Sequence, residues 1–105
     1  MKNRAPRHLS PAARSWFAEL VKEYSIADAG GLALLTVAAE AWQRAGEARE
    51  LLAREGAVVR DRFGQAIAHP AVRIEQGARA QLLQAMKQLH LDIEPLKSVG
   101  RPGGY

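Results

Sequence analysis

The chain has 105 residues, no cysteine and a net charge of +4, from 15 basic and 11 acidic residues. Its length fits one domain, and the absence of cysteine excludes disulfides and thiolate metal sites and suits a reducing cytoplasm. Since no apolar run approaches the roughly 18 residues of a membrane span and residues 1–11 lack the apolar core of a signal peptide, we expect a soluble intracellular protein without metal, cofactor or membrane partner.

The apolar residues predict a small core. Hydrophobic residues make up 48% of the chain, but 20 of them are alanines. A chain of this size buries only about two thirds of the surface that it exposes when unfolded. An alanine-rich subunit therefore gains by burying further surface against copies of itself, so the composition favours an oligomer.

Charge is distributed unevenly along the chain. Residues 1–14 carry four basic side chains and no acid, residues 15–56 have a net charge of −3, and residues 57–79 have a net charge of +2. Basic segments therefore flank an acidic one, a pattern that permits binding to a phosphate backbone. A basic N-terminal segment that only aids solubility fits the same pattern, and both interpretations stay open.

The N-terminal part predicts an arm followed by a helix. Residues 1–9 contain few apolar groups and include Pro6, which predicts a flexible basic arm. A helix begins at Ser10-Pro11, because the serine oxygen can accept a bond from an unpaired amide and proline at the first helical position loses no hydrogen bond. It extends to about Ser25. Its apolar stripe consists of Ala13, Trp16, Phe17, Leu20, Val21 and Tyr24.

The longest predicted element is a helix from Leu32 to Glu55, opened by Asp28 and closed by Gly56. Polar residues recur along one side at steps of four and three, which is the helical period. On the opposite side, small residues let a second helix come close. A helix of this length spans roughly 36 Å, which predicts an elongated subunit. The small-residue seam consists of Leu34, Ala38, Ala41, Ala45, Ala48 and Leu52.

This long helix does not have the pattern of a DNA-recognition helix. Recognition helices place cations near their start to meet phosphates and base edges. No lysine or arginine occurs between Lys22 and Arg44. We therefore place the candidate DNA contacts outside this helix.

Residues 57–68 predict a short β-hairpin. Two apolar pairs flank the turn from Asp61 to Gly64, and glycine readily takes the positive φ that such a turn needs. Arg60 and Arg62 straddle Asp61 at the tip. We favour a local ion pair over a DNA contact for these two arginines.

The last predicted helix runs from about Ala71 to His90 and follows His69, which we interpret as structural rather than catalytic. Its stripe repeats the steps of four and three, so it can pack antiparallel to the long helix. The predicted fold is all-α, with an N-terminal helix beside a long antiparallel helical hairpin that ends in a β-hairpin tip. It forms one domain over residues 10–96, followed by a flexible tail over residues 97–105. The stripe consists of Ala71, Ile74, Ala78, Leu82, Ala85 and Leu89.

Four segments carry a family resemblance: HLSPAARSWF, the alanine-rich long helix with Trp42, LLAREGAVVRDRFGQAIAHPAV and LHLDIEPLKS. In this order they resemble the small subunit of a tailed-bacteriophage terminase, and they cover nearly the whole chain. The C-terminus departs from the family pattern. Asp92 stands where the family usually has a small residue or glycine, and a single Arg101 stands where the family has an arginine-rich C-terminal end. The most specific marks are Glu55, Gly56, Gly64, His69, Pro70, Leu91 and Pro95.

The resemblance implies a non-enzymatic ring of more than four copies in the host bacterial cytoplasm. Such a ring recognises double-stranded viral DNA, recruits the large terminase subunit and modulates its ATPase and nuclease. The chain contains no GxSxG, HExxH or phosphate-loop motif that would indicate an enzyme. The alternative is a helical oligomeric adaptor or assembly protein that binds only protein partners.

The candidate site residues form two groups. The DNA-binding group consists first of Lys2, Arg4 and Arg7 in the arm, where no acidic residue pairs with them. Arg60 and Arg62 at the hairpin tip are the second choice. The oligomer-interface group lies on the long helix and is expected to be buried within or between subunits: Ala41, Trp42, Ala45 and Ala48.

Overall fold

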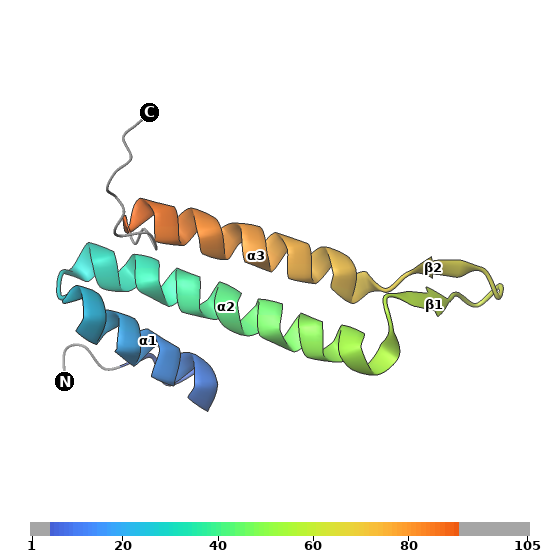
Figure 1. Cartoon of the computed structure of the whole chain (residues 1–105), viewed down its shortest axis with the longest axis horizontal. Coiled ribbons are helices and arrows are strands. Elements are labelled where there is room, and N and C mark those ends of the chain that lie inside the picture. The colour runs from blue at the N-terminus through green and yellow to red at the C-terminus, as the bar shows by residue number, and fades with distance from the viewer. Residues whose placement is uncertain (1–4, 91–105) are drawn as a thin grey trace, which may run out of the picture.

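A computed structural model describes residues 5–90 (Figure 1). The predicted domain end at residue 96, the predicted tail over 97–105 and the first four residues of the predicted arm lie outside this range. The described elements are α1 (Pro11–Tyr24), α2 (Ala29–Glu55), β1 (Val58–Arg60), β2 (Ala66–Ala68) and α3 (Pro70–Gln88). The described chain is therefore mostly helical, with one small antiparallel sheet, as predicted.

The elements form an elongated arrangement. α2 and α3 lie side by side and antiparallel, α1 lies against the first half of α2, and the two strands extend beyond the far end of the helices (Figure 1). α2 has 27 residues, which corresponds to about 40 Å. None of the helices within residues 5–90 combines the length and apolar character that a membrane crossing requires.

Local capping explains where α1 and α2 begin. The Ser10 hydroxyl accepts a hydrogen bond from the Ala13 amide at 3.2 Å, and Pro11 occupies the first helical position. The Asp28 carboxylate accepts from the Gly31 amide at 2.8 Å. Because this cap acts on the residues that follow directly, α2 begins at Ala29, three residues before the predicted start.

The seam between α2 and α3 is built from small residues. Ala41, Ala45 and Ala48 are buried on α2, and Ala71, Ala78 and Ala85 are buried on α3. At the solvent-exposed edge of the seam, Arg44 on α2 donates to the Gln81 side chain on α3 at 3.2 Å. Small side chains allow the helix axes to approach closely, and alanines are the buried apolar residues of α3 in this seam.

One position in the predicted stripe of α3 is wrong. Ile74 is 49% exposed, whereas its neighbour Glu75 is buried in the seam. The rest of the stripe keeps its predicted side, since Ala71, Ala78 and Ala85 are buried, and Glu75 joins them with two arginine partners, Arg79 on its own helix and Arg49 on α2. An acid that is paired in this way can be buried. The apolar periodicity therefore predicts burial of Ile74, whereas the structure buries its neighbour Glu75.

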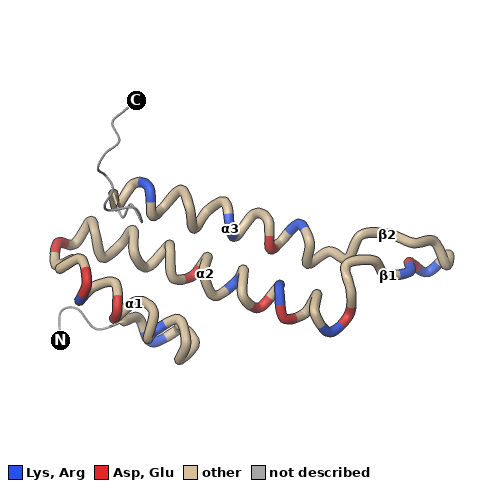
Figure 2. Tube along the Cα trace, viewed as in Figure 1, with Lys and Arg blue, Asp and Glu red and all other residues tan. Residues whose placement is uncertain are grey.

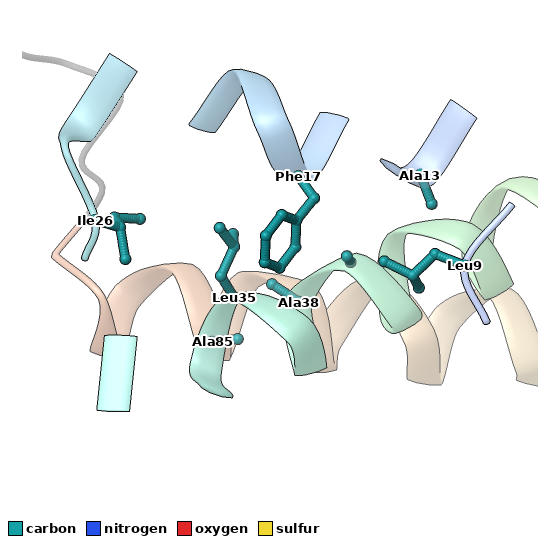
Figure 3. Packing of buried hydrophobic residues seen from close by; sticks show 8 residues of the cluster. Leu9, Ala13, Phe17, Ile26, Leu35, Ala38 and Ala85 are labelled. Carbon is teal, nitrogen blue, oxygen red and sulfur yellow. The ribbon is translucent and has the colours of Figure 1, made fainter. Parts of the chain in front are cut away.

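The larger apolar side chains gather where α1 meets α2. Phe17 and Leu35 are the largest fully buried side chains, and both point into this cluster (Figure 3). Trp16 stacks on Trp42 at its edge, with ring centroids 5.4 Å apart and ring planes 14° from parallel. The buried members of the cluster are Leu9, Ala13, Phe17, Ile26, Leu35, Ala38, Ala39 and Ala85.

The described part of the predicted flexible arm is packed, so that prediction is corrected for residues 5–9. Leu9 is buried in the core, and Ala5 packs against it. His8 Nε2 lies 2.7 Å from Glu40 Oε2, and the Ser10 amide donates to Gln43 Oε1 at 2.9 Å. The segment has few apolar groups, but α2, which is distant in the sequence, supplies partners for those that are present.

Candidate nucleic-acid and assembly surfaces

The β-hairpin tip is a tight turn held by an aspartate. β1 and β2 pair antiparallel with Val59 opposite Ile67, and Gly64 takes a φ of 81°. The Asp61 carboxylate accepts from the backbone amides of Phe63 at 2.8 Å and Gln65 at 2.9 Å. Both amides would otherwise be unpaired in the turn, so Asp61 has a structural role at this position.

This geometry overturns the predicted ion pair at the tip. Within residues 5–90, neither Arg60 nor Arg62 forms a salt bridge. Arg60 Nη1 donates to the Gly64 carbonyl at 2.6 Å, and the Arg62 guanidinium lies over the Phe63 ring, 5.4 Å from its centroid. Because Asp61 is engaged by the backbone, both arginines keep their charge available for an external acidic group.

Phe63 is the most exposed of the large apolar side chains in the described chain, at 76%. Phe63 is not among the site residues predicted from the sequence. A phenylalanine in the otherwise polar turn from Asp61 to Gln65 is the signal that could have found it, since turn residues point outward. Arg60, Arg62 and Phe63 are called the tip cluster below.

His69 joins the two long helices. Its Nδ1 accepts from the Ala71 amide at 3.0 Å, capping α3, and its Nε2 lies 2.7 Å from Glu55 Oε1 at the end of α2. A ring nitrogen that accepts carries no proton, so the neutral ring donates to Glu55 from Nε2. The structural role predicted for this histidine is confirmed.

A second polar contact crosses the seam at Glu75. Arg79 Nη2 and Nε donate to Glu75 Oε2 at 2.6 and 3.1 Å, and Arg49 Nη1 donates to the same oxygen at 3.5 Å. The hydrogen bond from Arg79 holds the pKa of Glu75 below its ordinary value. Glu75 therefore stays ionised at neutral pH and links α3 to α2.

The outer side of α2 carries a shallow groove of about 560 Å³ next to the start of α1. Apolar atoms form its floor and two acids lie along it. Figure 2 shows acidic and basic residues interspersed along the second half of α2, and basic residues on both sides of one acidic residue at the hairpin tip. The residues that line this α2 groove are Ser10, Ala12, Trp42, Gln43, Gly46, Glu47, Arg49, Glu50 and Ala53.

The chain matches the family model of the phage terminase small subunit over residues 13–103. That match covers α1, both strands, the long hairpin and residues beyond the described range. The chain belongs to the phage terminase small subunit family. No curated protein matches it, and no solved structure matches it. The general role of this small subunit is therefore in phage genome packaging.

The small subunit distributes its predicted DNA-binding residues over two places. Lys2 and Arg4 lie outside the described residues, and Arg7 is exposed beside the start of α1. Arg60 and Arg62 lie at the opposite end of the long hairpin (Figure 1). The structure brings Arg60 and Arg62 together at the tip but does not bring them near Arg7.

The predicted interface residues also separate into two kinds. Ala41, Ala45 and Ala48 are at most 5% exposed in the single chain, because they form the seam with α3. They are therefore buried within the subunit, which is one of the two expected places, and a contact of these alanines with a second copy stays a prediction. Trp42 is half-buried, lines the α2 groove and is the one of the four with surface to offer a partner.

The described residues do not suggest a metal centre. Within residues 5–90, no three histidine, aspartate or glutamate side chains are grouped so as to hold a metal ion. His8 and His69 each pair with one glutamate, Glu40 and Glu55. These pairs join segments of the fold to one another.

Proposed function

We propose that this small subunit forms a ring of more than four copies in the host bacterial cytoplasm and binds double-stranded viral DNA. The ring recruits the large terminase subunit and regulates its ATPase and nuclease, without catalysing a reaction itself. The observation that carries the proposal is the family match over residues 13–103. The thin, elongated subunit with a small core supports assembly, because copies side by side bury the surface that one chain leaves exposed.

The N-terminal arm is the proposed phosphate-binding segment. Lys2, Arg4 and Arg7 carry three charges with no acid among the first 14 residues. Several arms that engage one duplex bind it more tightly than one arm alone, since each further contact is intramolecular. The exposed Arg60 and Arg62 are the second candidate, because no acid within residues 5–90 neutralises them.

Neutralising the arm tests the proposed DNA contact. The triple variant Lys2→Gln, Arg4→Gln, Arg7→Gln should weaken binding to duplexes of any sequence and leave the oligomer intact. If each arm contacts about two phosphates, the slope of log affinity against log salt falls by about 1.8 for every arm that engages the duplex. Fluorescence anisotropy at several salt concentrations measures both quantities.

The matched control is the double variant Arg60→Gln, Arg62→Gln. Unchanged affinity and slope in the arm variant, with a loss in this control, would move the DNA contact to the hairpin tip. Absence of DNA binding by the wild type at low salt would instead support the adaptor that binds only proteins, since an apolar protein contact releases few counterions.

A further inference from the structure

We infer that the tip cluster of one copy docks in the α2 groove of a second copy. This inference rests on the proposed ring and names the surfaces that would hold it together. The contact is heterologous, with a different surface from each copy, and repetition of such a contact closes a ring when its rotation allows. The occupant of the groove is therefore the segment Arg60, Arg62 and Phe63 of a neighbouring chain.

Charge complementarity is the first argument. Arg60 and Arg62 form no salt bridge within residues 5–90, and neither do Glu47 and Glu50 at the groove. Glu47 accepts a hydrogen bond from the neutral Gln43 amide at 3.1 Å. Arg49 also lines the groove, but its guanidinium pairs with Glu75 on α3 at 3.5 Å. One subunit thus presents two arginines without a salt bridge at the tip and two glutamates without a salt bridge at the groove. Pairing them between copies satisfies both sets and sets the orientation of the contact.

The shape of the two surfaces is the second argument. Phe63 projects from the tip, 76% exposed, with the Arg62 guanidinium over its ring. The groove has a volume of about 560 Å³ and an apolar floor that includes the half-buried ring of Trp42. Aromatic and arginine side chains that enter a concave surface supply much of the energy of protein interfaces. The groove offers both the space and the apolar contact that Phe63 lacks in its own chain.

The third argument comes from Gly46, in the middle of α2 and on the groove floor. Glycine inside a helix is less stable than alanine because its backbone loses more freedom on folding. A Cβ at Gly46 would meet only the Arg49 guanidinium, at 3.9 Å, so the single chain has room for alanine. Close approach of a partner at this point supplies a reason for glycine that the isolated subunit does not.

A chain cannot fill its own groove with its own tip. The two strands extend beyond the end of α2, away from α1 (Figure 1), whereas the groove is lined by α2 residues between Trp42 and Ala53 and by Ala12 of α1. The tip of a chain therefore points away from the groove of the same chain. The docked tip must therefore come from another copy.

Charge reversal with rescue tests the contact. The double variant Arg60→Glu, Arg62→Glu and the double variant Glu47→Arg, Glu50→Arg should each raise the concentration at which the oligomer dissociates by at least about tenfold, because like charges then meet. The chain that carries all four substitutions should regain assembly. Native mass spectrometry and sedimentation velocity at matched ionic strength measure the oligomer, and circular dichroism confirms that each variant is folded.

A matched pair of glycines gives a second test. Gly46→Ala and Gly77→Ala both replace a mid-helix glycine that has room for a Cβ, but Gly77 does not line the α2 groove. Both should raise the melting temperature of the subunit. Only Gly46→Ala should weaken assembly, by about tenfold in the dissociation concentration. Equal dissociation concentrations for the two variants would mean that no second copy contacts the groove at Gly46, which would overturn the inference.

The outcomes separate this inference from the proposed function. A wild-type chain that stays monomeric at micromolar concentration overturns both. A wild-type oligomer that both charge-reversed variants retain overturns the docking contact alone and leaves the ring in place. If the tip variant assembles normally but loses affinity for DNA, the tip cluster is a phosphate-binding site and the docking contact is wrong.

Discussion

Glu75 shows how one residue ties the two long helices together. Its carboxylate is buried between α2 and α3 and receives hydrogen bonds from Arg79 and Arg49. An acid in such a place costs desolvation energy unless cations and donors surround it. The Arg49 and Arg79 side chains are 57% and 58% exposed, so water still solvates both guanidinium groups and their desolvation energy is small. The charge therefore specifies the register of the hairpin as well as its stability.

The lowered pKa of Glu75 predicts how stability depends on pH. A folded pKa below the ordinary value of 4.5 means that the ionised side chain stabilises the fold above about that pH. This contribution is lost as pH falls through the lower folded pKa. The variant Glu75→Gln should therefore melt below the wild type at pH 7, and the difference should shrink towards pH 3.

Thermal unfolding followed by circular dichroism measures this difference. Glu23→Gln, on the exposed side of α1, is the control, because Glu23 forms no salt bridge within the described residues. It should leave the melting temperature nearly unchanged at both pH values. A Glu75→Gln gap that stays constant from pH 7 to pH 3 would contradict an ionic role for the carboxylate.

At the scale of elements, the start of α2 depends on a compact cap. The Asp28 carboxylate binds the Gly31 amide, and a Cβ at Gly31 would come within 2.8 Å of Asp28 Oδ1. A side chain at Gly31 would therefore displace the capping carboxylate, so glycine at this position leaves room for the cap. Ile26, buried just before the cap, anchors the turn between α1 and α2 to the core.

Loss of this cap should destabilise the subunit by a modest amount. Asp28→Ala leaves the Gly31 amide without its partner and should lower the free energy of unfolding by about 1 kcal/mol. Asp28→Asn keeps an oxygen acceptor and should lose less. Urea unfolding at a fixed protein concentration compares the variants, and an equal loss in both would mean that charge rather than capping is responsible.

At the scale of the whole molecule, the alanine seam decides whether the subunit folds at all. Ala45 is 1% exposed in the single chain, between α2 and α3. Ala45→Glu places an unpaired charge there, which costs several kcal/mol. We expect this variant to lose helical circular dichroism together with assembly, because the hairpin itself cannot close.

Ala33→Glu is the matched control, since Ala33 lies on the same helix and is exposed. It should keep the helical signal and the melting temperature within a few degrees of the wild type. Folded, helical monomers of the Ala45→Glu variant would place the seam between copies and not inside one. Circular dichroism and native mass spectrometry on the same samples distinguish the two results.

Features that depend on neighbouring residues in the chain could be predicted from the sequence alone. Ser10 with Pro11 starts a helix, Asp28 starts the next, and Gly56 ends it, because capping involves groups only a few residues apart. The hairpin turn at Gly64 follows from the same local chemistry. The alternation of apolar and polar residues then showed which helix faces meet, and the family resemblance rested on these marks.

Features that depend on a partner distant in sequence were decided by the tertiary structure. The burial of Leu9 requires the surface of α1 and α2, and the packing of α3 on α2 gives Glu75 a second partner, Arg49, 26 residues away, besides Arg79 on its own helix. Within residues 5–90, Arg60 and Arg62 form no salt bridge, because the Asp61 carboxylate already accepts hydrogen bonds from the backbone amides of Phe63 and Gln65. Such contacts cannot be predicted from the spacing of residues along the chain, because the groups that bury a side chain or pair with it come close only when the chain folds.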